Sequence, residues 1–356
     1  MPITLNGTTG ITTPTYNGNT TAEYLVPVTG FKNRIINGAM TFDQRNAGAS
    51  VTPTDGQYTL DRWASWASAS SKYTVQQNAA SVTPPAGFKN YLGVTSASSY
   101  SVSSSDYFAV AQYIEGYNSA DLAWGTANAK TVTLSFWVRS SLTGTFGGCF
   151  SNGGYSRQYP FSYTISSANT WEQKTITVAG DTSGTWLTTN SSGIRVVFSL
   201  GMGSSVSGTA GSWTASSFYS ATGATSVVGT NGATFYITGV QLEVGSTATS
   251  FDARDYGREL MLCQRYYQVR NFPGDYACIW TGDLVSATSN NYFYVEPFPV
   301  AMRAAPTGTI INSNRNGFDA PNFTRVAVSG MGVTATNNAS GSRMYFQFNY
   351  TVSAEL

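Results

Sequence analysis

The residues that most often carry out chemistry in enzymes are scarce in this chain. Its 356 residues include no histidine. Ser-His-Asp and Cys-His nucleophiles, HExxH zinc proteases and histidine-ligated metal centres are therefore excluded. Glycoside cleavage needs no histidine, because two carboxylates suffice. The 18 acidic residues leave that chemistry open, but no pair among them stands out. We expect a protein without catalytic residues, with a polysaccharide depolymerase as an alternative.

Cysteine and aspartate patterns give little support to a metal or cofactor. Cys149, Cys263 and Cys278 are widely spaced and form no CxxC motif. Because their number is odd, at least one is unpaired within the chain, and all three are expected to be reduced and structural. The turn-like run 181–184 (Asp-Thr-Ser-Gly) lacks the DxDxDG pattern of a calcium loop. We expect no cofactor and assign no metal site, with calcium held by oxygen ligands as a weak alternative.

Aromatic residues are abundant, with 22 Tyr, 19 Phe and 8 Trp. Their rings can cover the C–H faces of sugars, while neighbouring amides and hydroxyls bond the sugar hydroxyl groups. One candidate cluster lies in the loop 201–232, which is rich in Gly, Ser and Thr, and the other lies between residues 276 and 292. The predicted glycan-binding residues are Trp213, Tyr219, Tyr276, Trp280, Asn290, Asn291 and Tyr292. For each of them, packing into a core or a subunit interface is the alternative.

Charge and hydropathy exclude two classes of partner. Only 10% of the residues are charged and the formal net charge is +1, whereas binding to a nucleic-acid backbone needs clustered cations. No apolar stretch approaches the roughly 20 residues that span a bilayer. The first six residues show neither the basic nor the apolar part of a secretory signal. Many aromatics with little charge also argue against a disordered chain.

The elements that would position these side chains are short strands. Between residues 31 and 251, β-type runs alternate with clusters of Gly, Ser, Asn and Thr, and helical patterns are lacking. The run 131–139 alternates polar and apolar residues, and runs at 173–178, 193–200 and 234–243 repeat the pattern. The residues expected on one face of the first run are Val132, Leu134, Phe136 and Val138. The sequence predicts a mainly β protein whose residues 31–251 form an antiparallel jelly roll or β-sandwich.

Two other segments flank this region. Residues 1–30 are rich in Thr, Gly and Asn, so they predict either an arm that is ordered on a partner or a disordered tail. Residues 269–356 return to β patterns, with strands expected at 291–296 and 342–350. In the second of these runs, one face carries Met344, Phe346, Phe348 and Tyr350. This segment is long enough for a smaller distal β domain.

A helix is expected over residues 252–268, between the two β regions. Asp252 can cap it, with Asp255 as an acid in the first turn. An apolar seam of about four turns then runs at i, i+4, i+7 and i+11 through Tyr256, Leu260, Cys263 and Tyr267. The seam can dock the helix on the neighbouring sheet, or it can pack around a symmetry axis as a short coiled coil.

Four blocks of sequence resemble a family of bacteriophage and prophage tail-fibre proteins. The block Asn33-Arg34-Ile35-Ile36-Asn37-Gly38-Ala39-Met40, with Phe42-Asp43-Gln44-Arg45 and Leu60-Asp61-Arg62-Trp63, is similar to that family's N-terminal block. Residues 237–245 and 249–251 are similar to the block that closes its jelly roll. Residues 256–267 resemble its helix, and residues 299–307 resemble its distal domain. Together these blocks frame most of residues 31–306.

The resemblance implies a virion component of a phage tail, with a carbohydrate-binding-like jelly roll, usually assembled as a homotrimer of sister subunits. We expect the 1–30 arm to bind other virion proteins and the 269–356 domain to meet a host-surface glycan. A purely structural virion protein, such as a decoration or baseplate component, is the alternative. Asp61 and Arg62 are expected to supply a charge-assisted pair that holds their strand against the sandwich.

Overall fold

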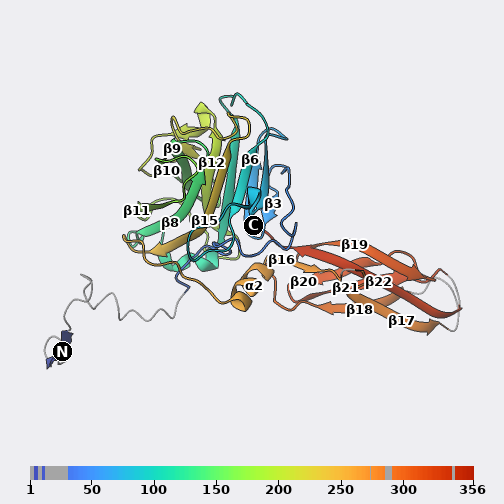
Figure 1. Ribbon diagram of the computed structural model, residues 1–356. Helices are drawn as coiled ribbons and strands as arrows, with labels where there is room; N and C mark the ends of the chain where they lie inside the picture. The colour runs from blue at the N-terminus through green and yellow to red at the C-terminus, as the bar shows by residue number, and fades with distance from the viewer. Residues whose placement is uncertain (1–3, 7–9, 13–30, 273, 285–290, 339–340) are drawn as a thin grey trace.

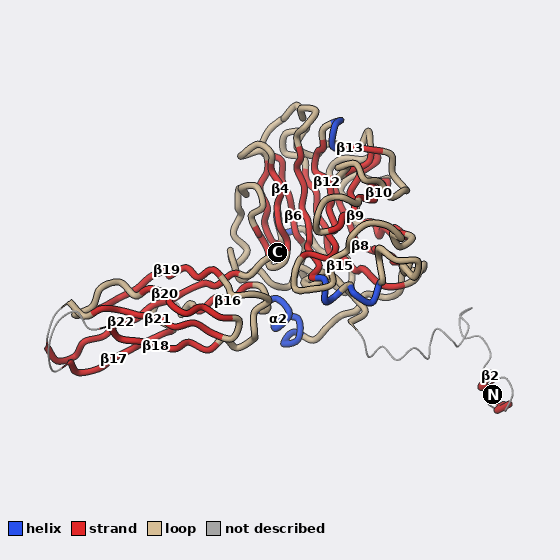
Figure 2. The backbone as a smooth tube through the Cα atoms, turned by 180° about the vertical axis from the view of Figure 1, so that it is seen from behind, coloured by secondary structure: helices blue, strands red, loops and turns tan. Residues whose placement is uncertain are grey.

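The computed structural model describes residues 4–6, 10–12, 31–272, 274–284, 291–338 and 341–356. It shows a jelly-roll β-sandwich, a short helix and a second, elongated β-sandwich that extends away from the jelly roll (Figures 1 and 2). The chain runs out along the second sandwich and returns, so that its last residues lie against the jelly roll (Figure 1). No helix among the described residues has the length and apolar character needed to cross a membrane.

Two antiparallel sheets form the jelly roll. The six-stranded sheet has the order β10-β9-β12-β7-β4-β3, with β3 Tyr58–Leu60, β4 Trp63–Ala67, β7 Tyr107–Glu115, β9 Gly144–Asn152, β10 Gln158–Ile165 and β12 Ser192–Met202. The five-stranded sheet has the order β11-β8-β15-β6-β5, with β5 Tyr73–Gln77, β6 Leu92–Ser96, β8 Val132–Ser140, β11 Glu172–Val178 and β15 Thr234–Val244. The smaller elements are η1 Ala79–Ser81, η2 Gly116–Asn118, η3 Ala120–Leu122, η4 Ser204–Val206 and the strand pairs β1 Thr4–Asn6 with β2 Gly10–Thr12 and β13 Ser207–Gly208 with β14 Ser220–Ala221.

The hydrophobic core lies between these two sheets, as the alternating sequence pattern predicts. Val132, Leu134, Phe136 and Val138 on β8 are all fully buried in it. Phe198 on β12 meets the ring of Phe136 edge-on, with their centroids 5.0 Å apart. Edge-to-face contacts of this kind add to the stabilisation from burial alone. The mainly β prediction and the jelly-roll architecture are therefore confirmed.

A bulge in β15 explains how the N-terminal segment 31–47 attaches to the sandwich. The register between β15 and β8 shifts between Thr238 and Gln241, and Gly239 has a φ of 60°, which glycine tolerates best. Within the bulge, the backbone N–H of Val240 donates to the carbonyl of Gly38, and the Val240 carbonyl accepts from the Asn33 side chain. The sequence blocks 33–40 and 237–245 therefore lie side by side in this structure.

The distal sandwich has its own core. Its larger sheet is built on β22 Gly341–Ser353, which pairs with β16 Tyr267–Arg270, β17 Cys278–Leu284 and β19 Thr307–Asn316. The smaller sheet has the order β18-β21-β20, with β18 Asn291–Pro297, β20 Asn322–Ala327 and β21 Gly330–Thr336. Met344, Phe346, Phe348 and Tyr350 are buried between the sheets on the face that the sequence predicts.

The helix is shorter than predicted. α2 spans Tyr256–Gln264, and its N-cap is Asp255, whose side chain accepts from the backbone N–H of Arg258. Asp252 is therefore not the cap, and its carboxylate instead accepts from the backbone N–H of Asn33. The helix cannot reach residue 268, because the chain enters β16 at Tyr267 and forms ladder hydrogen bonds with β22.

The predicted four-turn seam is consequently not one exposed stripe. Cys263 is buried within this chain, in a cluster that includes Phe42 of the N-terminal segment, and Leu260 packs against the same cluster. Tyr267 is buried as well, in β16. Tyr256 is the exposed member of the four, at 67%. Leu260 and Cys263 thus dock the helix on the jelly-roll side of the junction, whereas packing of its exposed side chains around a symmetry axis stays a prediction. All three cysteines are buried and free.

Candidate functional site

An aromatic pocket opens on the outward face of the six-stranded sheet. Strand alternation sends Trp63 and Phe108 into the core and leaves Trp66 of β4 and Tyr113 of β7 on the opposite face. Small side chains lie between these rings on the same face, at Ala64, Ala109 and Ala111. Because alanines leave the sheet surface low, the surrounding rings stand as walls above it.

Four segments that are distant in sequence supply the walls of this pocket, whose volume is about 310 Å³. The lining side chains include Asp55, Trp66, Tyr107, Tyr113, Tyr155 and Tyr219. The ring of Trp66 meets Tyr219 edge-on, with centroids 5.4 Å apart, and meets Tyr107 edge-on at 6.3 Å. Tyr155, from the loop between β9 and β10, is the most open ring, with 37% of its surface exposed. We call this site the aromatic pocket.

Hydrogen bonds fix the polar groups of the aromatic pocket. The hydroxyl of Tyr107 donates to Asp55 Oδ2 at 2.9 Å, and the backbone N–H of Ala67 donates to Asp55 Oδ1 at 3.0 Å. The indole N–H of Trp66 donates to the Tyr113 hydroxyl at 2.8 Å. Carboxylate, hydroxyls and ring faces are thus held in place before any ligand arrives, which reduces the entropy lost on binding.

A buried arginine supports the most exposed ring. The Arg195 guanidinium lies 3.6 Å from the centroid of the Tyr155 ring, and it donates to the carbonyls of Asn152 and Gly153 in the same loop. This cation–π contact and the two hydrogen bonds orient the β9–β10 loop. Burial raises the pKa of Tyr155 to about 12. Burial also raises the pKa of Tyr107, and the hydrogen bond from its hydroxyl to Asp55 raises it further. Both hydroxyls therefore stay protonated at neutral pH.

The two jelly-roll residues predicted for glycan binding, Trp213 and Tyr219, lie at different sites in the structure. Tyr219 lines the aromatic pocket. Trp213 does not, because the 201–232 loop folds back and places its ring against Trp124 and Trp186, at centroid distances of 5.3 and 5.4 Å. Its indole N–H donates to the carbonyl of Ala179. Packing against the core, the alternative stated for each aromatic, describes Trp213.

The distal candidates lie in another part of the molecule. Trp280 stacks on the core residue Phe346 with an interplanar angle of 7°, and it also contacts Tyr292. Tyr276 is half-buried in the turn before β17, whereas Asn291 is exposed and accepts from the Thr336 hydroxyl. Asn290 lies outside the described residues. None of the three pockets described in this structure is lined both by Tyr219 and by one of these distal residues.

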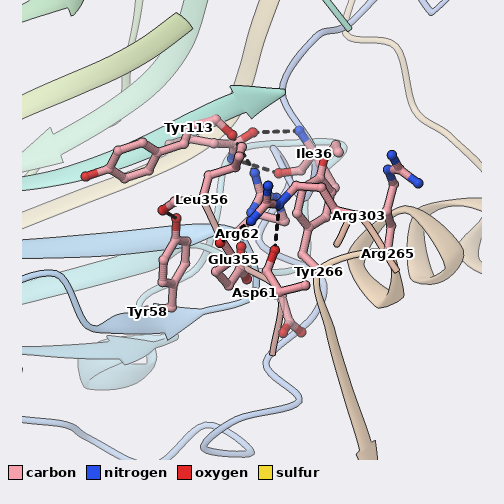
Figure 3. Close-up of polar contacts among 12 residues, drawn as sticks. Ile36, Tyr58, Asp61, Arg62, Tyr113, Arg265, Tyr266, Arg303, Glu355 and Leu356 are labelled. Atoms are coloured by element: carbon pink, nitrogen blue, oxygen red, sulfur yellow. Dashed lines mark hydrogen bonds and ion pairs between the residues drawn. The ribbon is translucent and has the colours of Figure 1, made fainter. Parts of the chain in front are cut away.

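Residues from three of the four sequence blocks meet instead at the junction between the two sandwiches (Figure 3). Arg62 is 1% exposed. Its guanidinium lies 3.5 Å from the centroid of the Tyr266 ring and donates to Glu355 and to the carbonyl of Tyr113. Arg45 donates to the same Glu355 at 2.7 Å. The prediction that Asp61 and Arg62 supply one charge-assisted pair is therefore wrong, because Arg62 pairs with Glu355 and Asp61 Oδ1 lies 3.8 Å from Arg45 Nε.

A second ion pair closes the other side of the junction. Arg265 donates twice to the carboxylate of Glu115, at 2.6 and 2.9 Å, and the hydroxyl of Tyr266 donates to the same carboxylate at 2.6 Å. Arg303 of the distal sandwich donates to the carbonyls of Asn190, Ala354 and Glu355. In this structure Arg265 therefore joins the helix to the jelly roll of its own chain.

The burial of Asp61 at the junction predicts that the stability of the fold depends on pH. Burial raises the pKa of Asp61 from 3.8 to about 6, although the Gln44 backbone N–H and Arg45 oppose the change. Because the folded-state pKa is raised, proton uptake stabilises the fold at low pH, and this contribution is lost as the pH rises through 6. The Asp61→Asn variant should therefore gain up to about 3 kcal/mol relative to wild type on going from pH 4 to pH 7. Urea unfolding of both proteins at pH 4 and pH 7 measures their free energies of unfolding. If the variant differed from wild type by the same amount at both pH values, the prediction would be wrong.

No family model matches the chain, and no curated protein matches it. Among solved structures, it is similar to the enzymatically active domain of bacteriophage CBA120 tailspike protein 4, with 12% identity and a TM-score of 0.33 over 60% of this chain. The match covers 21% of that tailspike chain, about a fifth of its length. A putative sugar-binding protein from Bacteroides thetaiotaomicron gives 11% identity and a TM-score of 0.34 over 60% of this chain and 100% of its own. TmCBM61 in complex with β-1,4-galactotriose gives 11% identity and a TM-score of 0.31, over 60% of this chain and 99% of its own.

Proposed function

We propose that this protein is a phage tail-fibre component, not an enzyme, that attaches the virion to host-surface glycans through the aromatic pocket. The observation that carries the proposal is the composition of that pocket. The open ring of Tyr155 can cover the apolar side of a sugar, while Asp55 and the tyrosine hydroxyls bond its hydroxyl groups. Of the residues described as lining the pocket, Asp55 is the one carboxylate, whereas glycoside cleavage uses two.

The tail-fibre part of the proposal is supported by the four resembling sequence blocks, three of which contribute residues to the junction, while the fourth contacts the 31–47 segment. It includes a homotrimer, for which exposed apolar side chains on the distal sandwich would supply contacts. Phe293 and Val295 alternate along β18 and are 58% and 75% exposed. Residues 1–30 would bind other virion proteins. Low individual affinities for a glycan would then add up through multivalent display.

Removing the ring of Tyr155 tests the proposal. A panel of defined oligosaccharides first identifies a ligand of the intact protein. Tyr155→Ala should then lower the affinity for that ligand about tenfold or more, which corresponds to about 1.4 kcal/mol, because the most open stacking surface is lost. Tyr155→Phe keeps the ring and should retain binding within about threefold.

Tyr117→Ala is the matched control, since Tyr117 is 61% exposed and lines none of the three pockets described in this structure. Affinity is measured by isothermal titration calorimetry, and adsorption of the phage to host cells is competed with each variant. If Tyr155→Ala bound the ligand as tightly as Tyr117→Ala does, the aromatic pocket would not be the receptor site.

A further inference from the structure

A second cavity, of about 490 Å³, lies between two loops at one end of the jelly roll. One wall comes from residues 119–126, which follow β7, and the other from residues 184–188, which precede β12. Trp186 and Leu187 are its largest partly open apolar side chains, and Leu187 is 39% exposed. None of the residues described as lining it carries a charge.

The loops around this cavity are held by interactions that the aromatic pocket does not use. Arg157 donates to both carboxylate oxygens of Asp181, at 2.6 and 2.8 Å, and Asp181 is 2% exposed. The carbonyl of Asp181 accepts from the backbone N–H of Gly125 on the opposite wall at 2.7 Å. A Cβ at Gly125 would lie 2.7 Å from the carbonyl oxygen of Gly184, so only glycine lets the two loops approach this closely.

The indole groups at the cavity are also fixed. The Trp124 N–H donates to the Lys130 carbonyl and the Trp186 N–H donates to the Ser183 carbonyl. Their rings meet edge-on with centroids 4.7 Å apart. Both N–H groups are already satisfied and Trp124 is 6% exposed, so what the indoles offer to a ligand is chiefly the apolar surface of Trp186. Ser119, Thr126, Thr185 and Thr188 add hydroxyl groups around it.

We infer that this cavity is a second carbohydrate-binding site, which takes an uncharged sugar. Apolar ring surface, an aliphatic side chain and several hydroxyls match the alternating C–H and O–H surface of a pyranose. A uronic or sialic acid would bring a carboxylate into a cavity without a cation, and burying an unpaired charge is costly. A phosphate-bearing ligand is disfavoured for the same reason.

One loop connects the two sites. Tyr155 of the β9–β10 loop lines the aromatic pocket, whereas Asn152 at the end of β9 and Arg157 of the same loop hold the rim of the second cavity. Asn152 Nδ2 donates to the carbonyl of Thr185 at 2.9 Å. The two sites therefore flank a single loop.

Fluorine NMR separates the two sites in one experiment. The intact protein is labelled with 5-fluorotryptophan at its eight tryptophans, and Trp66, Trp124 and Trp186 are assigned by single Trp→Phe variants. Cellotetraose, maltotetraose and chitotetraose are titrated to millimolar concentration, with tetragalacturonate as the acidic comparison. We expect at least one neutral tetrasaccharide to shift the Trp124 and Trp186 resonances saturably, and tetragalacturonate to leave them in place.

The outcomes distinguish this inference from the proposed function. Shifts at Trp66 alone would overturn the second site and leave the aromatic pocket standing, whereas shifts at Trp186 that persist in Tyr155→Ala would establish the second site by itself. If no neutral tetrasaccharide moves Trp186, or if tetragalacturonate moves it equally, the inference is wrong. Leu187→Ala, at an exposed position, should weaken the Trp186 response about threefold or more while leaving any Trp66 response unchanged.

Discussion

Replacing Glu355 by alanine is expected to lower the free energy of unfolding by about 3–5 kcal/mol, because it leaves a buried charge without a partner. Arg62 is 1% exposed, and Glu355 is the carboxylate to which it donates. Arg45 donates to the same carboxylate and would lose that partner too. The Tyr113 carbonyl and the Tyr266 ring remain, but neither carries a compensating negative charge.

Asp121→Ala is the matched control for this loss. Asp121 also accepts from an arginine, Arg34, at 2.7 Å, but its side chain is 47% exposed. Solvent screening makes such pairs worth about 0–1 kcal/mol. Chemical denaturation of both variants at pH 7 and moderate salt gives the comparison. A loss at Glu355 no larger than the loss at Asp121 would show that the junction does not depend on this ion pair.

The second large effect is expected from Phe346→Ala in the distal sandwich. Phe346 is fully buried, stacks on Trp280 and contacts Phe318 edge-on. Truncating a buried phenylalanine typically costs about 3–5 kcal/mol, through lost burial and the cavity left behind. The jelly-roll core does not include Phe346, so the aromatic pocket should keep its affinity for a glycan at temperatures where the distal sandwich is still folded.

Phe272→Ala provides the same change at a ring that is 60% exposed, where a cost under about 0.5 kcal/mol is expected. Differential scanning calorimetry reports the stability of each variant, and titration with the glycan ligand reports binding. If Phe346→Ala abolished glycan binding while the jelly roll stayed folded, the receptor site would belong to the distal sandwich, where the sequence placed most of its candidates.

Local patterns made most strands predictable. The alternation of Val132, Leu134, Phe136 and Val138 indicates β8 without any knowledge of its neighbours, because burial on one face requires period two. The predicted helix, 252–268, is longer than α2 for a related reason. Tyr267 fits the spacing of the helical seam, but its backbone pairs with Ser353, and a partner so distant in sequence leaves no local signal.

The aromatic pocket was less accessible to sequence reasoning. Trp66, Tyr107, Tyr155 and Tyr219 come from separate segments, and their convergence depends on the order of the strands in the sheet. A partial signal existed, since Trp66 falls on the opposite face of its strand from the core residue Trp63. Arg62 shows the same difficulty, because its carboxylate partner lies 293 positions away.

The way in which the distal sandwich is joined to the jelly roll has a mechanical consequence. The chain enters the sandwich beside the Arg265–Glu115 pair and leaves it beside the Glu355–Arg62 pair, so both ends are fastened to the same body. A pulling force applied to the far end of the sandwich is therefore divided between two parallel tethers and does not unzip one strand after another.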